Sequence, residues 1–192
     1  GEWIIALRSG YFAKSEILRC PMATQRRPGG GAWGGPFNTY SMPVGGSGTT
    51  TGGEEPSYGA NLWLSNPDHG ITDIQTRPTV NNWRRSSAAK DPNRVPVFMD
   101  TMWRGAGPVE SGNPNGDPPR FDGEWVDAAG GDNNHEMYHV CINRHDGYVN
   151  YLFMDWSVRR VGLKELWKLK WHRNFNTNGP WTLAGGCAPT DW

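Results

Sequence analysis

The sequence predicts a single α+β domain in which an antiparallel β-meander is closed by a C-terminal helix. Three observations predict it. The length of 192 residues fits one domain. Residues 136–161 contain short runs in which apolar and polar side chains alternate, as they do in half-buried strands. Residues 163–172 place Leu163, Leu166 and Trp167 on one side of a predicted helix.

The first half of the chain is expected to hold few regular elements. Residues 1–12 have the apolar spacing of a short amphipathic helix, and residues 17–20 are expected to be a short extended segment. Residues 28–55 and 104–134 are two long loops rich in Gly and Pro. Loops of this length favour a binding or assembly role over a simple connection.

Several segments are predicted strands because they are short, β-branched or aromatic, and alternating. Val149, Tyr151 and Phe153 are expected on one face of the best of them, with Asp155-Trp156 as a two-residue hairpin turn. In another, Pro96 indicates a strand start or a sheet edge. The predicted strands are residues 58–64, 95–100, 136–143, 148–154 and 157–161.

The composition excludes some functional classes. The 19 basic and 19 acidic residues balance, which disfavours nucleic acid or a membrane surface as the partner of the whole chain. No apolar run reaches the roughly 18–20 residues of a membrane helix. The content of Trp, Gly, Asn and Thr suggests an exported protein, in which cysteines tend to pair. Of the three cysteines, Cys20 and Cys141 flank apolar segments and are the predicted disulfide, whereas Cys187 lies in a Gly-rich tail.

Residues 145–155 carry a recognisable motif, because His145 is followed by nine residues and then Asp155. This stretch resembles the H-x9-DG pattern of bacterial proteins associated with prepilin-type processing, the type IV pilin-like and pseudopilin-like proteins of the type II secretion class. The stretches 157–167 and 18–21 are similar to the same family. Trp156 is a departure, since the family has Gly there.

The resemblance implies a pilin-like head that serves as a non-enzymatic structural subunit of an extracellular or cell-surface filament, built from copies of itself. Such proteins normally begin with a long apolar helix that packs in the filament core. That helix is absent from this sequence, so we expect that it is removed, that other pilin-like chains supply it, or that the filament is built differently.

The motif itself is interpreted as structural. Ten strand steps span about 33 Å, so one ion cannot touch both His145 and Asp155 unless the chain folds back. We therefore expect Asp155 to cap the hairpin turn. A type I′ turn needs positive φ at both central residues, which Trp disfavours, so we expect another turn type with Trp156 projecting outward.

Two alternatives stay open. Residues 135–139 read His135-Glu136-Met137-Tyr138-His139, which matches the H-E-x-x-H zinc motif of metallopeptidases, with Glu165 as a third ligand. Val140 and its neighbours favour a strand, on which the two histidines would lie about 13 Å apart. The other alternative is a secreted carbohydrate-binding or adhesion module, in which exposed indole rings form sugar platforms; the candidates are Trp33, Trp63, Trp83, Trp103, Trp125 and Trp192.

Charge is unevenly distributed along the chain. The stretch from Glu110 to Glu136 contains seven acidic residues and one basic residue. The stretch from Arg159 to Arg173 contains six basic residues and one acidic residue. Opposite charges on opposite faces would help copies of a subunit to stack. The residues expected to make assembly contacts are Trp33, Trp156, Arg159, Arg160, Lys164 and Lys168. No cofactor is expected; calcium suits the acidic loops, but no EF-hand spacing supports it.

Overall fold

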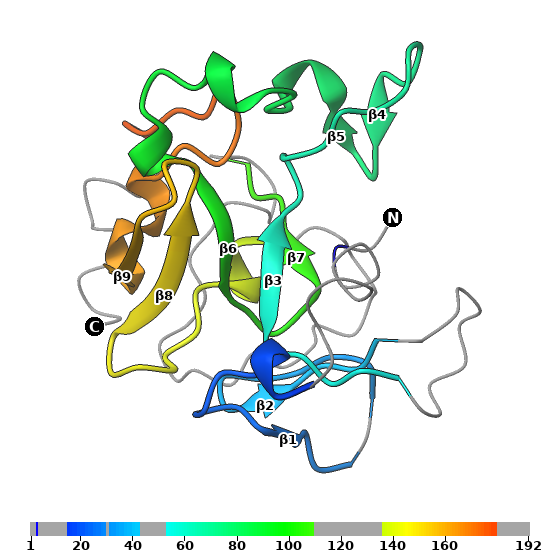
Figure 1. Ribbon diagram of the computed structural model, residues 1–192, viewed down its shortest axis with the longest axis vertical. Helices are drawn as coiled ribbons and strands as arrows, with labels where there is room; N and C mark the ends of the chain where they lie inside the picture. The colour runs from blue at the N-terminus through cyan, green and yellow to red at the C-terminus, as the bar shows by residue number, and fades with distance from the viewer. Residues whose placement is uncertain (1–2, 4–14, 30, 43–52, 110–135, 180–192) are drawn as a thin grey trace.

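The computed structural model describes residue 3 and residues 15–29, 31–42, 53–109 and 136–179 (Figure 1). Its largest sheet is mixed and has five strands in the order β7-β3-β6-β8-β9. Neighbouring strands are antiparallel, except that β3 and β7 run parallel. The strands are β3 (Tyr58–Asn61), β6 (Pro96–Asp100), β7 (Gly105–Ala106), β8 (Tyr148–Phe153) and β9 (Val158–Gly162).

Two smaller pairs of strands lie outside this sheet. β1 (Gln25–Arg26) runs parallel to β2 (Asn38–Thr39), in and beside the first predicted loop. β4 (Asp73–Ile74) and β5 (Arg77–Pro78) form a hairpin whose two loop residues both have positive φ. β2 thus gives local order within the segment 28–55 that the sequence predicted as a loop.

Every helix with described bounds is a short 3₁₀ helix, so the fold is mostly β and the predicted α+β class is correct only in its β part. In a 3₁₀ helix, residues three apart share a face, and Leu163, Leu166 and Leu169 are accordingly buried in a row. The predicted helix over residues 1–12 lies outside the described residues apart from Trp3. The six helices are η1 (Ser15–Leu18), η2 (Thr79–Asn81), η3 (Ser86–Ala88), η4 (Pro92–Arg94), η5 (Glu136–His139) and η6 (Leu163–Lys168).

The predicted strands over residues 58–64, 95–100, 148–154 and 157–161 are confirmed with small shifts of their ends. Val149, Tyr151 and Phe153 of β8 are buried together, as the alternation predicted. Pro96 is the first residue of β6, but β6 lies inside the sheet rather than at its edge.

Two segments were predicted wrongly. Residues 136–143 begin with η5 instead of forming a strand, because Glu136 and His139 turn together toward buried polar partners while Met137 and Val140 enter the core. The third antiparallel strand beside β8 and β9 is therefore β6. Residues 17–20 are not extended, since η1 runs through Leu18.

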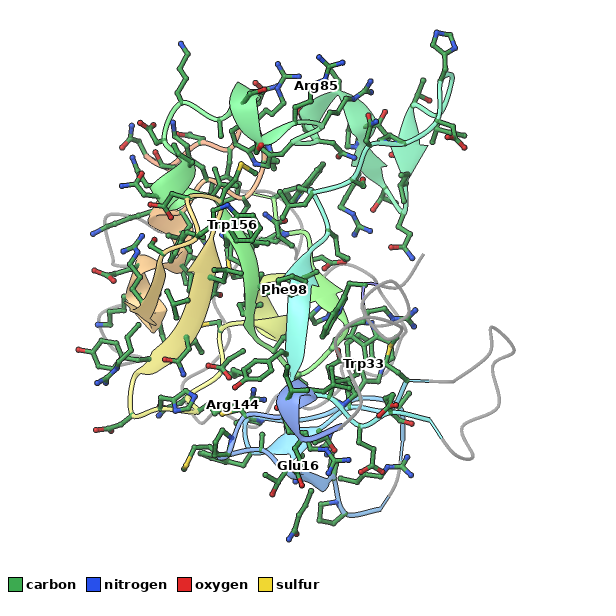
Figure 2. The ribbon with its side chains drawn as sticks, in the orientation of Figure 1. Glu16, Trp33, Arg85, Phe98, Arg144 and Trp156 are labelled. Atoms are coloured by element: carbon green, nitrogen blue, oxygen red, sulfur yellow. The ribbon has the colours of Figure 1, made fainter. Side chains whose placement is uncertain are left out.

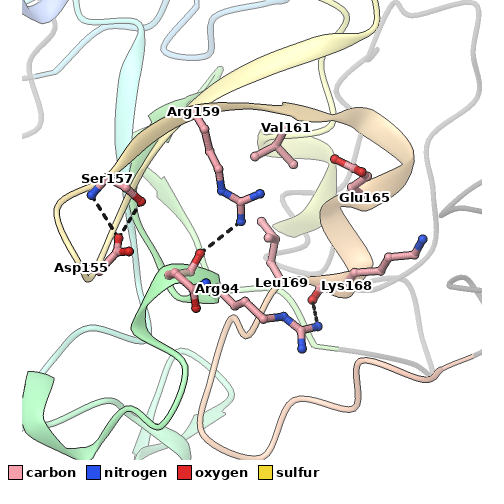
Figure 3. Close-up of a pocket in the computed structure, with 9 residues that line it drawn as sticks. Arg94, Asp155, Ser157, Arg159, Val161, Glu165, Lys168 and Leu169 are labelled. Carbon is pink, nitrogen blue, oxygen red and sulfur yellow. Dashed lines mark hydrogen bonds between the residues drawn. The ribbon is translucent and has the colours of Figure 1, made fainter.

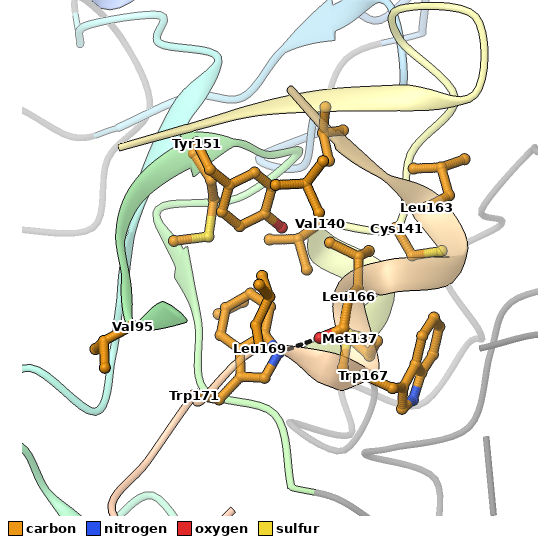
Figure 4. Close-up of a cluster of buried hydrophobic side chains, with 14 of the residues drawn as sticks. Val95, Met137, Val140, Cys141, Tyr151, Leu163, Leu166, Trp167, Leu169 and Trp171 are labelled. Carbon is orange, nitrogen blue, oxygen red and sulfur yellow. Dashed lines mark hydrogen bonds between the residues drawn. The ribbon is translucent and has the colours of Figure 1, made fainter. Parts of the chain in front are cut away.

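The core lies where η5 and η6 pack against one face of the sheet (Figure 4). Trp171 and Tyr151 meet there edge to face, and the Trp171 indole donates a hydrogen bond of 2.9 Å to the carbonyl of Leu166. Burying each large apolar side chain of this kind contributes about 1.5–3 kcal/mol. The core therefore holds η6 against the sheet and fixes the position of β9.

The predicted Cys20–Cys141 disulfide is not formed. Cys141 lies in the apolar core around η6 (Figure 4). Cys20 lies in a different, polar environment, with its Sγ 3.4 Å from Nε2 of His145. The bridge was predicted wrongly because both flanking segments are apolar but pack in different clusters. None of the described helices has the length and apolar character needed to cross a bilayer.

Candidate functional site

The two motif residues of the H-x9-D stretch lie at opposite ends of β8. Asp155 follows the strand, where its Oδ1 accepts hydrogen bonds from the Ser157 amide at 3.0 Å and the Ser157 hydroxyl at 2.6 Å. The side-chain hydrogen bond from Ser157 lowers the pKa of Asp155 below its ordinary value. This contact agrees with the interpretation of Asp155 as a turn cap.

The hairpin between β8 and β9 has three loop residues rather than two. Phe153 pairs with Ser157 through a backbone hydrogen bond of 2.9 Å, and Trp156 between them has a φ of 68°. A left-handed residue in this position is usually Gly, because a side chain there is disfavoured. The Trp156 side chain is 79% exposed, so it projects outward as expected (Figure 2).

Strand β9 continues this exposed surface. Every residue from Asp155 to Arg160 is exposed, and Val158 reaches 72%. Arg159 lies 4.1 Å from the centre of the Phe153 ring, and Arg160 lies 4.2 Å from that of Tyr148. These cation–π contacts hold the arginines on opposite faces of the strand. Together, Trp156, Val158, Arg159 and Arg160 are called the hairpin surface below.

A groove of about 590 Å³ lies beside the hairpin surface, between β9, η4 and η6 (Figure 3). Arg159 donates to the carbonyl of Asn93 at 3.1 Å, and Arg94 donates to the carbonyl of Lys168 at 2.5 Å. Within the part of the chain that the structure describes, Arg94, Arg159 and Lys168 form no salt bridge. The groove is also lined by Asp155 and Glu165, so it carries three cationic groups against two carboxylates.

Of the predicted basic contact residues, Arg159 and Lys168 line this groove, whereas Arg160 lies on the opposite face of β9 and Lys164 lines a separate pocket beside Tyr148. Arg160 and Lys168 are exposed, and Lys164 is half-buried on η6. The acidic stretch, with the calcium candidates in it, lies outside the described residues up to residue 135. Glu136 is a correction, because it is buried and does not belong to an exposed acidic face.

The described part of the H-E-x-x-H stretch is engaged within the fold. Glu136 pairs with Arg77 at 2.9 Å and accepts a 2.8 Å hydrogen bond from the Gly107 amide, while Nδ1 of His139 lies 3.0 Å from the Gly105 carbonyl. Burial acts to raise the pKa of Glu136, but the hydrogen bond from His139 and the nearby positive charges lower it overall.

Such a carboxylate is an ion-pair partner rather than a general base beside a zinc-bound water. His135 lies outside the described residues. The suggested third ligand, Glu165, accepts a hydrogen bond from the Gly162 amide in the first turn of η6. The arrangement of these residues does not favour the metallopeptidase alternative.

Of the four candidate sugar platforms among the described residues, two are buried and two are half-buried. Trp63 and Trp83 are buried, and Trp125 and Trp192 lie outside the described residues. Trp33 and Trp103 stack on each other, with ring centres 4.1 Å apart, beside a pocket of about 520 Å³. His139 lies against the Trp33 ring, and Arg104 lies over the Trp103 ring. Because each ring is stacked on the other and has a second neighbour, the pair is not the flat, solvent-facing platform that the carbohydrate alternative expects.

At the other end of β8, His145 joins a buried polar cluster that sequence reasoning missed. Its Nε2 lies 3.1 Å from Oδ2 of Asp100, which is fully buried at the end of β6. Asp100 also accepts a 2.7 Å hydrogen bond from the Asn150 amide and forms a 3.1 Å ion pair with Arg144. Neither Asp100 nor Arg144 stands in a motif that would have singled it out.

Arg144 organises this region, because all five of its guanidinium N–H groups have acceptors. Burial lowers the pKa of Arg144, and the nearby Asp100 carboxylate opposes that shift. Three separate segments, residues 35–36, 57 and 100–101, are therefore tied to one side chain, which is labelled in Figure 2. The acceptors are Pro36 O at 2.5 Å, Ser57 O at 2.7 Å, Asp100 Oδ1 at 3.1 Å, Thr101 O at 3.1 Å and Gly35 O at 3.2 Å.

A turn aims His145 into the cluster. Asp146 and Gly147 have φ of 54° and 82°, the pair of left-handed conformations of a type I′ turn, which Asp-Gly favours. The Asn143 side chain accepts a 2.7 Å hydrogen bond from the Gly147 amide. Burial raises the pKa of the Cys20 thiol, so the cysteine is not an activated nucleophile.

Comparisons with protein-family models, with curated proteins and with solved structures give no match to this chain. The likeness to pilin-like proteins therefore rests on the residues quoted for it.

Proposed function

We propose that the protein is a structural subunit of an extracellular, pilus-like or pseudopilus-like filament, in which copies of the chain assemble through the hairpin surface and the cationic groove. The observation that carries the proposal is the exposure of Trp156. Its side chain projects into solvent although its backbone has a positive φ, which is unfavourable for a residue with a large side chain. A large aromatic side chain exposed beside arginines has the composition of an interface anchor.

The partner that fits this surface is a second copy of the chain. The groove carries three cationic side chains, Arg94, Arg159 and Lys168, against two lining carboxylates, Asp155 and Glu165, and the same sequence holds six acidic residues between positions 110 and 132. An acidic stretch from one copy can therefore neutralise the groove of the next. Such a contact joins two different surfaces and so repeats along a filament rather than closing into a dimer.

The exposed edge of β9 supports contact through side chains rather than strand pairing. Consecutive arginines on an outer strand discourage the addition of another strand. At the same time, they leave the hairpin surface open to an acidic partner. The assembly contact is consequently electrostatic at its rim and aromatic at Trp156.

Sedimentation velocity of the purified chain tests the proposal. We expect larger species in about 0.01 M salt that dissociate in about 1 M salt, because the screening length falls from about 30 to 3 Å. The double substitution Arg159→Glu and Lys168→Glu should abolish the larger species. The matched control, Arg84→Glu with Arg85→Glu, makes the same charge change at exposed residues outside the groove and should leave assembly intact.

A chain that stays monomeric in both salts, or one whose assembly survives the groove substitutions, contradicts the proposed interface. A salt-independent monomer that binds a glycan would instead support the carbohydrate-binding alternative.

A further inference from the structure

The Cys20–Asp100–His145 cluster brings together three side chains from distant parts of the chain. Nε2 of His145 lies 3.4 Å from Sγ of Cys20 and 3.1 Å from Oδ2 of Asp100. The three potential ligand atoms lie within 4.8 Å of one another. Sulfur, imidazole nitrogen and carboxylate oxygen are the three ligand types that zinc uses in proteins.

We propose that Cys20, Asp100 and His145 bind one zinc ion, a site separate from the assembly surface. Zinc ligands at their usual bond lengths in tetrahedral geometry are separated by about 3.4–3.6 Å. The two distances from His145 are already close to this spacing. Small side-chain shifts therefore suffice to place one ion among the three atoms.

The orientation of the histidine distinguishes a metal site from a catalytic triad. In a cysteine nucleophile site, the thiol and the carboxylate contact opposite nitrogens of the ring. Here both contact the same nitrogen, Nε2. A single N–H points well at only one acceptor, which leaves the Cys20 thiol with weak hydrogen bonds at most, whereas an ion between the three atoms contacts all of them.

Binding changes the protons in a defined way. The ion takes the lone pair of Nε2, so the neutral ring carries its proton on Nδ1. The Cys20 thiol releases its proton to solvent and binds as the thiolate. The thiolate and the Asp100 carboxylate together supply two negative charges to balance the ion.

Neighbouring residues hold the proposed ligands in position through hydrogen bonds, as the residues around the ligands of known zinc sites do. Arg144 holds Oδ1 of Asp100, and the Asn150 amide holds Oδ2. The Ser57 hydroxyl accepts a 2.6 Å hydrogen bond from the Cys20 amide. The Asp100 side chain is fully buried, but that of His145 is 20% exposed. Solvent thus has access on the histidine side, where a water molecule can complete the coordination.

The ion would link the segment after η1 to β6 and to the turn before β8. A ligand that binds only the folded state stabilises it by mass action. The proposed site would therefore cross-link Cys20, which forms no disulfide, to the motif residue His145. This role does not depend on filament assembly.

Cobalt(II) titration of the reduced, metal-free full chain tests the site. We expect one equivalent to bind with a thiolate-to-cobalt charge-transfer band in the near ultraviolet, and zinc to displace it. Cys20→Ser should abolish the band, and His145→Gln should weaken binding at least about 10-fold, the minimum that even an outer partner contributes. Cys141→Ser, at the other buried cysteine among the described residues, is the matched control and should keep the band.

The wild-type titration is decisive even if a variant does not fold, which near-ultraviolet circular dichroism reports. Absence of the charge-transfer band in the wild-type chain overturns the proposal. So does a band that persists in Cys20→Ser or disappears in a folded Cys141→Ser.

Discussion

The two ends of β8 have opposite characters although one sequence motif spans them. Before the strand, His145 enters a buried network in which Asp100 and Arg144 are fully enclosed. After the strand, Asp155 and Trp156 lie in an exposed turn. The first end joins distant segments of the chain, and the second presents side chains to solvent.

This difference separates what holds the fold together from what is free for a partner. Buried charges are tolerated only when they are paired and hydrogen-bonded, so substitutions at the first end should change stability. Exposed side chains contribute little to stability, so substitutions at the second end should change assembly. Each prediction below tests that division.

The largest effect is expected at Arg144. Replacing it with Ala leaves Asp100 buried without its ion pair and removes five hydrogen bonds, and should cost about 3–5 kcal/mol of unfolding free energy. Arg160→Ala, on the hairpin surface, should stay within about 0.5 kcal/mol. Urea denaturation of both variants measures their free energies of unfolding. Equal losses of unfolding free energy would contradict the distinction between the two ends of β8.

A second buried ion pair, between Glu136 and Arg77, allows a comparison with the contribution of Arg144 to stability. Glu136→Gln weakens the contacts to Arg77 and the Gly107 amide and should cost about 1.5–3 kcal/mol at neutral pH. The pKa of Glu136 is lowered in the folded state, so its contribution is fully present above the ordinary value of 4.5 and is lost as the pH falls through the folded-state pKa.

Denaturation curves of wild type and Glu136→Gln should consequently converge on acidification below pH 4.5. A difference that grows as the pH falls would show that the ionised carboxylate is not the stabilising form.

A smaller effect on stability than at Arg144 or Glu136, and one of opposite sign, is expected at Trp156. Glycine accepts a φ of 68° without strain, so Trp156→Gly should stabilise the monomer by about 1 kcal/mol while weakening assembly. Trp156→Ala keeps the unfavourable conformation and removes the ring, so it should weaken assembly without that gain. Thermal unfolding and sedimentation measure the two properties, and a destabilised Trp156→Gly would show that the ring packs within its own subunit.

The sequence predicted the elements that local patterns specify. Alternation identified β8, β-branched and aromatic composition identified β6, and the hairpin turn after β8 identified β9. The spacing of Leu163 and Leu166 identified the buried face of η6, although three-residue periodicity was mistaken for an α-helix. The two-residue turn was predicted at Asp155-Trp156, but Asp146-Gly147 has the required conformations. Asp-Gly is the stronger turn signal and was available in the sequence.

The buried network could not be predicted because its members are isolated in the sequence. Asp100 ends an apolar strand, and its partner Arg144 is 44 positions away. Cys20 and His145 are separated by 125 positions. Nothing in local periodicity pairs such residues, since only the folded sheet brings the end of β6 beside the start of β8.

Electron microscopy of material from the native source, with antibodies against this chain, tests the central claim most directly. The account predicts regular fibres that the antibodies decorate along their whole length, and that come apart as salt is raised. Antibody reaction confined to dispersed single molecules, with unlabelled fibres or none, would contradict it.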